Sequence, residues 1–203
     1  MNERKKRVLR RALITLAGLI LFLVGLFLSL PLLFAPPDVA PADVIMHLAI
    51  EARLHGDEYV ARLYAEGVAR KVICASSQAS WEVYPADYAR AHLIELGVRA
   101  DDISVLHFPI TDCGGEVMPV LISRLKEQGA KSVLLVVDPT VTRFGRWRTR
   151  SRFQEAGINA TITFAAEDRR AMLDRWWRTH WKAQRIVLTL MNSSLDLLYA
   201  PCR

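Results

Sequence analysis

The sequence predicts an α/β domain: a Rossmann-like open sheet of about five mainly parallel strands with helices on both faces, preceded by one transmembrane helix. Two observations predict the domain. Short apolar runs alternate with amphipathic segments of helical period after residue 42, and several amphipathic segments end at a glycine. A third observation, a long uncharged apolar run near the N-terminus, predicts the membrane helix.

The apolar runs are expected to form the strands. Each is four to six residues long and rich in aliphatic side chains. Because strands that alternate with helices pair in parallel through right-handed crossovers, helices should cover both faces of the sheet. The predicted strands span residues 43–48, 71–75, 103–106, 132–137 and 160–164.

The segments between these runs are expected to form helices. Four of them span residues 58–66, 86–96, 117–128 and 144–156, and Gly67, Gly97, Gly129 and Gly157 follow them as stop signals. Two further helices are expected around residues 172–181 and 185–199. In the first of these, Trp177 and Trp181 share one face, so both are expected to pack against the body of the domain.

The N-terminal region predicts a membrane anchor. Six cations and one acid lie within residues 1–11, and an uncharged run of 23 residues follows at 12–34, long enough at roughly 34 Å to cross a bilayer. The positive-inside bias places the N-terminus in the cytoplasm and the rest of the chain outside the inner (plasma) membrane. A cleaved signal peptide is the alternative, although the run is long and Pro36-Pro37 follows it. The expected organisation is a basic tail at 1–11, a span at 12–34, a linker at 35–42 and one domain at 43–203.

The charge of the outer domain is divided along the chain. The net charge of +6 falls to +1 without residues 1–11. Residues 38–131 carry nine cations and fourteen acids, whereas residues 143–185 carry eleven cations and four acids. No aromatic-rich binding sheet accompanies the arginines, and the expected compartment holds no nucleic acid, so nucleic-acid binding is not expected. Anionic small molecules or lipid head groups are the expected partners, with a solvated arginine-rich helix face as the alternative.

The three cysteines do not form a disulfide framework or a zinc site. Cys74 lies in an apolar run and is expected to be buried. A bridge between Cys113 and Cys202 is left open.

The candidate ligand site lies after the carboxyl ends of the strands, where open parallel sheets bind their ligands. Hydroxyls, a glycine pair and arginines in neighbouring loops match the needs of a phosphate or another anion. A plain strand-to-helix connection at Gly114-Gly115 and a helix-capping role for the serine pair are the alternatives. The candidate binding residues are Ser76, Ser77, Thr111, Glu116, Asp138 and Arg143.

Arg143 is the residue of this set expected to point into the cleft, since it is nearest to a strand end. Arg146 and Arg150 share its helix face, whereas Arg148 and Arg152 lie on another. Glu116 is expected to orient Arg143 through a salt bridge, with a general-acid role as the alternative. His47 falls inside the first strand and is expected to be packed there. No metal-ligand spacing, P-loop, nucleophile elbow or dinucleotide fingerprint is found in the sequence.

The order of these segments resembles the YdcF/SanA/ElyC-like family of bacterial envelope proteins, over about residues 42–199. The resemblance is carried by residues 61–67 leading into 71–76, by 93–98, by 132–137 followed by Thr142-Arg143, and by Trp176-Trp177 and 197–199 near the end. It implies an anchored protein that acts in cell-wall or surface-polysaccharide biogenesis on a phosphate-bearing intermediate. The alternative is a non-catalytic interaction module with a vestigial cleft.

The chain departs from the family pattern at several positions. Ser76, Thr111, Glu116 and Arg143 match family positions, whereas Leu48-Ala49, Ser77-Gln78, Pro85, Cys113-Gly114, Asp138 and Val141 replace family residues. Val141 stands where the family has a histidine, so the expected general base near neutral pH is missing. The resemblance therefore implies the fold and a ligand class, and it leaves the chemistry open.

Overall fold

The computed structural model describes residues 14–19, 21, 25, 32–49, 56–81, 83–108 and 117–198. The chain divides into two compact units, Met1–Phe34 and Ala35–Arg203. The predicted linker at residues 35–42 thus belongs to the second unit. Most of the predicted anchor, including the basic tail at 1–11, lies outside the described residues. Within the described part of the chain, no helix has the length and apolar character needed to cross a membrane.

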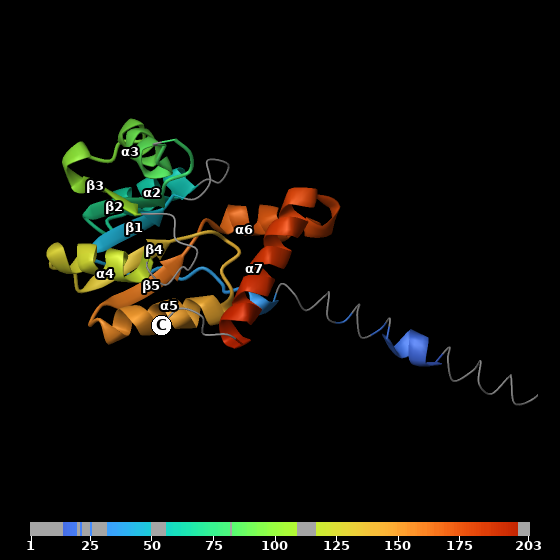
Figure 1. The fold of residues 1–203 in the computed structure, drawn as a ribbon. Helices are drawn as coiled ribbons and strands as arrows, with labels where there is room; N and C mark the ends of the chain where they lie inside the picture. Colours follow the sequence, from blue (N-terminus) through green and yellow to red (C-terminus); the bar gives the residue numbers. More distant parts are fainter. Residues whose placement is uncertain are drawn as a thin grey trace, which may run out of the picture. The chain divides into compact units, whose positions relative to one another are not determined.

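The second unit is built on a fully parallel sheet of five strands in the order β3-β2-β1-β4-β5 (Figure 1). This confirms the predicted α/β class and all of the predicted strands. β1 lies in the centre, with Met46 opposite Ile73 of β2 and Leu135 of β4. The strands are β1 (Val44–Leu48), β2 (Lys71–Ser77), β3 (Ile103–Phe108), β4 (Ser132–Val136) and β5 (Asn159–Thr163).

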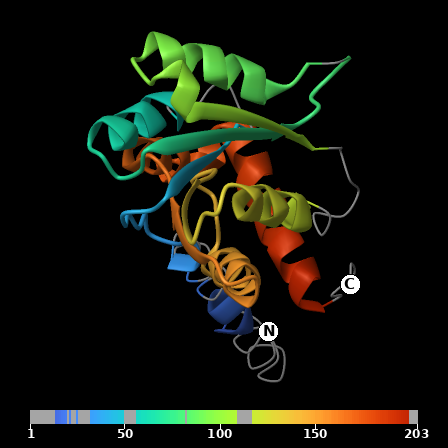
Figure 2. The same ribbon diagram turned by 90° about the vertical axis from the view of Figure 1, so that its left-hand side faces the viewer.

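Helices cover both faces of this sheet, as predicted (Figure 2). On one face, Ile45 packs in a core with residues of α2 (Gly56–Ala65) and α3 (Pro85–Glu95). On the other face, Met46 packs in a core with residues of α4 (Val117–Glu127) and α5 (Arg143–Glu155). Because successive side chains of a strand point to opposite faces, β1 contributes to both cores and must be apolar almost throughout.

Glycine ends four of these helices, as the sequence predicts. Gly67, Gly97, Gly129 and Gly157 follow α2, α3, α4 and α5 with φ between 68° and 94°. This left-handed conformation lets the next residue bond back into the last turn, as Val98 N does to Leu93 O at 2.9 Å. Each glycine therefore turns the chain from a helix into the following strand.

The C-terminal region differs from the prediction. The expected helix over residues 172–181 is wrong: α6 (Ala166–Leu173) ends early, a 3₁₀ turn η2 (Trp176–Arg178) follows, and α7 (His180–Leu198) begins anew. The chain reverses at Arg175, whose φ of 45° is left-handed, unlike any other non-glycine residue that the structure describes. Helical spacing counted across this break has no structural meaning.

The break also changes which tryptophan is buried. Trp176 is 7% exposed and contributes to the interior, whereas Trp177 and Trp181 are 52% and 40% exposed. The prediction that Trp177 and Trp181 pack against the domain is therefore wrong. The turn at Arg175 directs Trp176 inward, and Trp177 meets it edge to face with ring centroids 6.2 Å apart.

Replacing Trp176 by alanine should destabilise the domain by about 3–5 kcal/mol, because it empties a large buried site. Trp177→Ala is the matched control, and it should have a much smaller effect because its ring is half exposed. Urea unfolding followed by circular dichroism measures both. Equal destabilisation by the two variants would contradict the assignment of Trp176 to the interior.

Candidate functional site

The sheet changes its winding direction between β1 and β4, and this switch point is where parallel sheets usually bind ligands. Of the predicted site residues, Ser76 and Ser77 end β2, Asp138 follows β4, and Arg143 begins α5. Thr111 and Glu116 lie outside the described residues, as do Cys113, Gly114 and Gly115. The expected convergence of Ser76, Thr111, Glu116 and Arg143, and the expected salt bridge to Glu116, therefore stay predictions.

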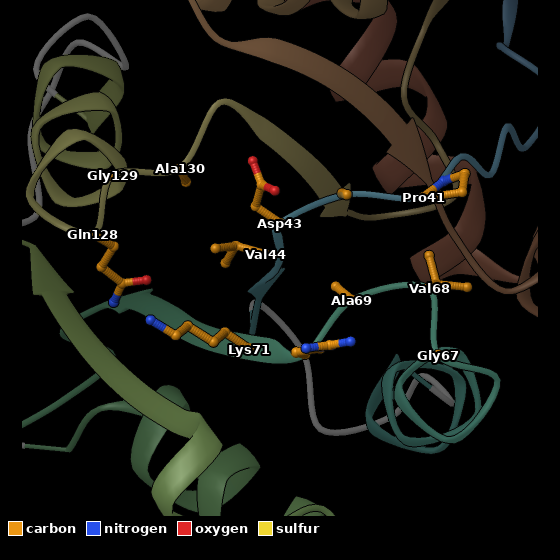
Figure 3. A pocket seen from close by; sticks show the side chains of 12 residues that line it. Pro41, Asp43, Val44, Gly67, Val68, Ala69, Lys71, Gln128, Gly129 and Ala130 are labelled. Atoms are coloured by element: carbon orange, nitrogen blue, oxygen red, sulfur yellow. The ribbon is translucent and has the colours of Figure 1, made fainter.

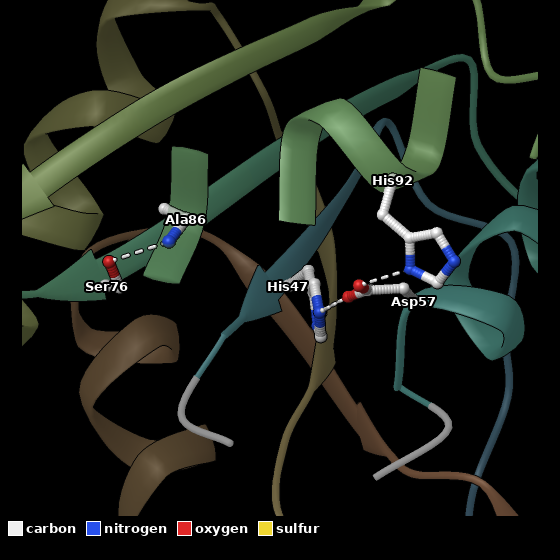
Figure 4. A network of polar contacts seen from close by, with 5 residues as sticks. All are labelled: His47, Asp57, Ser76, Ala86 and His92. Carbon is white, nitrogen blue, oxygen red and sulfur yellow. Dashed lines mark hydrogen bonds and ion pairs between the residues drawn. The ribbon is translucent and has the colours of Figure 1, made fainter. Parts of the chain in front are cut away.

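Ser76 has a structural contact on the α3 side of the sheet. Its buried Oγ accepts a hydrogen bond of 3.0 Å from the backbone nitrogen of Ala86, in the first turn of α3 (Figure 4). The residue that precedes this helix, Tyr84, supplies no side-chain cap. Ser76, in the neighbouring strand, therefore caps the start of α3. This is the helix-capping role that the sequence left as the alternative to ligand binding.

Asp138 ties the loop after β4 to the C-terminal helix. Its Oδ2 accepts a 2.5 Å bond from the guanidinium of Arg185, and its Oδ1 accepts from both the backbone nitrogen (2.7 Å) and the hydroxyl of Thr140. A charged pair of this kind is strong because both partners are largely shielded from water. The carboxylate of Asp138 is thus occupied by this chain's own donors.

Two of the predicted arginines hold the segment before β1. Arg146 donates to the carbonyl oxygens of Pro36 and, at 3.0 Å, of Ile162. Arg150 forms a 2.6 Å ion pair with Asp38. Sequence spacing predicted that Arg146 and Arg150 share a face, and that face contacts residues 36–38 and β5.

Arg143, Arg146 and Arg169, here called the arginine cluster, gather near the carboxyl ends of β4 and β5. Burial and the charges of Arg150, Arg169 and Arg143 together lower the pKa of Arg146. Burial and the charge of Arg143 likewise lower the pKa of Arg169. Asp38 acts in the opposite direction on the pKa of Arg146. The charge of Arg143 thus reaches both other members of the cluster.

Two members of the arginine cluster, Arg143 and Arg146, lie at the start of α5, and Arg169 lies in α6. Thr142 caps this helix, with its Oγ1 accepting a 3.0 Å bond from Gly145 N. Gly145 fits closely, because a Cβ there would lie 3.2 Å from that oxygen. The positive end of the helix dipole therefore adds to the charge of the arginines. Arg143 itself is exposed, and its predicted orientation into a cleft stays a prediction.

The structure also brings together three polar residues that the sequence did not connect. Asp57, in the first turn of α2, accepts hydrogen bonds from His47 Nε2 at 2.7 Å and from His92 Nδ1 at 2.9 Å (Figure 4). His47 is buried in β1, as predicted, and His92 lies in the last turn of α3. One carboxylate thus links three elements on the same face of the sheet.

Close backbone packing makes room for this network. A Cβ at Gly56 would lie only 2.9 Å from Cε1 of His47, so glycine lets α2 approach the ring. Because Nε2 of His47 bonds to Asp57, Nδ1 is the remaining hydrogen-bonding atom of this ring. Nδ1 is buried, and no group among the described residues bonds to it.

The network shifts the ionisation of two of its members. Burial raises the pKa of Asp57, but the hydrogen bonds and charges of His47 and His92 outweigh it, so the net pKa lies below the ordinary 3.8. The hydrogen bond to Asp57 raises the pKa of His92 above 6.5, against a smaller opposing effect of burial. Both shifts favour the charged pair.

The available sequence signal for this network was weak. His47 and Asp57 are ten residues apart, and His92 follows 35 residues after Asp57. Only the pairing of β1 with β2, and the packing of α2 and α3 on one face, bring them together. The sequence likewise indicated no partner for His107. Its ring stacks on that of Tyr84, with centroids 3.9 Å apart, and its Nε2 lies 3.1 Å from the Asp87 carboxylate.

Cys74 is buried in β2, as predicted. Burial, together with the charge of Asp57, raises the pKa of its thiol to about 12. The thiol is therefore protonated at neutral pH and acts as a small apolar side chain.

A hollow of about 540 Å³ lies at the opposite, amino-terminal edge of the sheet, next to Asp43, Lys71 and Gln128 (Figure 3). The carboxylate of Asp43 there accepts from Lys131 N at 2.8 Å and Ser132 N at 2.9 Å. These bonds, with a further one from the Ser132 side chain, lower the pKa of Asp43. This edge is where β1 and β4 begin, and its polar groups fix that geometry.

No protein-family model matches the sequence, and no curated protein matches it. The family resemblance therefore rests on the order of the sequence patterns.

The Asp57–His92 pair should make stability depend on pH. Its contribution is fully present between the ordinary pKa of Asp57, 3.8, and that of His92, 6.5. It is lost as pH falls through the pKa of Asp57 or rises through the raised pKa of His92. The free energy of unfolding of wild type minus that of His92→Gln should be largest inside this window. His180→Gln, at an exposed histidine, is the control and should give a flat difference; a flat difference for His92→Gln as well would refute the pair.

Proposed function

We propose that this chain is a membrane-anchored envelope protein of the YdcF/SanA/ElyC-like type, whose outer domain binds a phosphate-bearing ligand at the arginine cluster. The single observation that carries the proposal is the gathering of Arg143, Arg146 and Arg169 at short range, where the charge of Arg143 lowers the pKa of both Arg146 and Arg169. Like charges that are held together and partly desolvated raise the free energy of the empty site. A bound anion relieves that repulsion.

The geometry around the cluster favours phosphate over a simple carboxylate partner. The capped start of α5 supplies a helix N-terminus, a common phosphate-binding position. The planar fork of Arg143 can donate two parallel hydrogen bonds to phosphate oxygens. Arg146 is fixed by its bonds to Pro36 and Ile162, so it supplies charge from a set position.

The biological setting comes from the predicted anchor and the family resemblance. Residues 12–34 would hold the protein in the lipid bilayer of the inner (plasma) membrane, with the domain on the outer side. A phosphate-bearing envelope intermediate on a lipid carrier is a ligand that such a domain could meet there. The proposed role is therefore in cell-wall or surface-polysaccharide biogenesis.

A second candidate is a non-catalytic interaction or scaffolding module with a vestigial cleft. It is favoured by the internal contacts of Ser76 and Asp138, which bond to Ala86 N and to Arg185. Side chains engaged in this way stabilise the fold without a ligand. The two candidates differ in whether the arginine cluster binds an anion.

Arg143→Lys should weaken binding of inorganic phosphate, sugar phosphates and phosphorylated lipid head groups by roughly tenfold, equivalent to about 1.4 kcal/mol. Lysine keeps the charge but loses the two-pronged fork. The measurement is the rise in melting temperature across a ligand titration. Arg148→Lys, on another side of α5, is the matched control and should behave like wild type. Equal responses in wild type and Arg143→Ala would remove the anion site and favour the interaction module.

A reporter active only outside the cytoplasm, fused after Arg203, should be active on the full chain. Neutralising the six cations of residues 1–11 should randomise that orientation, because they supply the positive-inside bias. A matched set of neutral substitutions at six arginines of residues 143–178 should leave the orientation unchanged. A cytoplasmic reporter on the intact chain would contradict the proposed topology.

A further inference from the structure

The helix α7 presents apolar side chains to solvent along one side. Trp181, Leu188 and Met191 are 40%, 47% and 53% exposed. Steps of seven and three residues bring them to the same side of a helix. Trp177, in the turn that precedes the helix, is also exposed, at 52%. These four residues are here called the α7 strip.

The side of α7 that packs most closely on its own domain is a different one from the α7 strip. On that side, Ile186 is completely buried, and the hydroxyl of Thr189 lies 3.3 Å from that of Thr140. An ordinary surface helix has one apolar side and one polar side. A second apolar side on α7, together with the exposed Trp177 in the turn before it, marks a surface that meets another apolar phase.

Cations outnumber acids in the sequence around the α7 strip, which exposed Asp174 precedes. Residues 175–191 include Arg175, Arg178, Lys182 and Arg185 but no aspartate or glutamate. Arg185 is paired with Asp138. Lys182 extends over the face of Trp181, with its Nζ 6.0 Å from the ring centre. The strip therefore combines tryptophan, aliphatic side chains and positive charge.

The backbone before the strip is held in an unfavourable conformation. Arg175 has a φ of 45°, in the left-handed region that non-glycine residues seldom adopt. This turn buries Trp176 and leaves Trp177 outside. A strained turn that exposes an aromatic ring is a feature expected at a binding surface.

We infer that the α7 strip is a docking surface for the face of a lipid bilayer that carries acidic head groups. Tryptophan settles at the interface between head groups and acyl chains, and flanking lysine and arginine attract anionic lipid. Charge complementarity selects this occupant over a second copy of the chain, because two such surfaces would bring their cations together. The strip lies parallel to the membrane and needs no spanning helix.

This inference goes beyond the anion site of the proposed function. None of the four strip residues belongs to the arginine cluster. Phosphate binding and docking can therefore fail independently, and separate variants test them.

The test uses the full chain in vesicles of phosphatidylcholine and phosphatidylglycerol at about three to one, with part of the phosphatidylcholine brominated near its head group. Bromine quenches tryptophan emission only on contact. Wild type should be quenched, and Trp177→Phe/Trp181→Phe should lose most of that quenching. Trp81→Phe/Trp147→Phe, which removes the two other exposed tryptophans, is the matched control and should keep it.

Charge is tested with Arg175→Gln, Arg178→Gln and Lys182→Gln. The ratio of docked to undocked domain should fall about fivefold for each cation replaced. A higher salt concentration should also lower this ratio, because it screens the attraction between the cations and the acidic lipids. Melting curves in detergent should match wild type, since these side chains lie at the surface.

Three results would overturn the inference. One is unchanged quenching in Trp177→Phe/Trp181→Phe. Another is equal quenching in vesicles of phosphatidylcholine alone. The third is a dimer of the wild-type chain in detergent that Leu188→Glu converts to a monomer, which would assign the strip to a second copy.

Discussion

The fold depends on the burial of β1 between two parallel neighbours. Its backbone pairs with β2 and β4, and its alternate side chains enter two separate cores, Ile45 with α2 and α3 and Met46 with α4 and α5. A strand in this position has no solvent face, so each polar group on it needs a partner. His47 is the exception to the apolar pattern of β1, and Asp57 provides that partner at 2.7 Å.

The same requirement explains how polar residues at the carboxyl edge are used. Ser76 caps α3, Asp138 holds Arg185 of α7, and Arg146 bonds to β5 and to the segment before β1. Residues that look like ligand-binding groups in the sequence therefore also fasten helices to the sheet. The arginine cluster differs, because its members lie within range of one another's charge: that of Arg143 lowers the pKa of both Arg146 and Arg169. This gathering of guanidinium groups is the basis of the proposed anion site.

The basic part of the chain contributes cations to two separate proposed surfaces. Residues 143–169 place guanidinium groups at the start of α5 and in α6, where a compact phosphate would fit. Residues 175–191 mix cations with exposed tryptophans, which suits an extended acidic surface. A single protein that holds a lipid-linked phosphate and rests on the bilayer would use both. The acidic half of the chain, in contrast, supplies Asp43 and Asp57 to internal hydrogen bonds.

The sequence by itself determined the class of fold, every strand and the glycine ends of the helices, because these follow from local periodicity and backbone freedom. It also identified Ser76 as a cap or a ligand and Cys74 as buried. Tertiary structure decided the rest. The His47–Asp57–His92 network depends on strand pairing between segments far apart in the chain, and Trp176 is buried in place of Trp177 and Trp181 because the chain turns at Arg175. Periodicity records which residues share a face of one continuous element, and it carries no information about breaks imposed by packing or about contacts between distant elements.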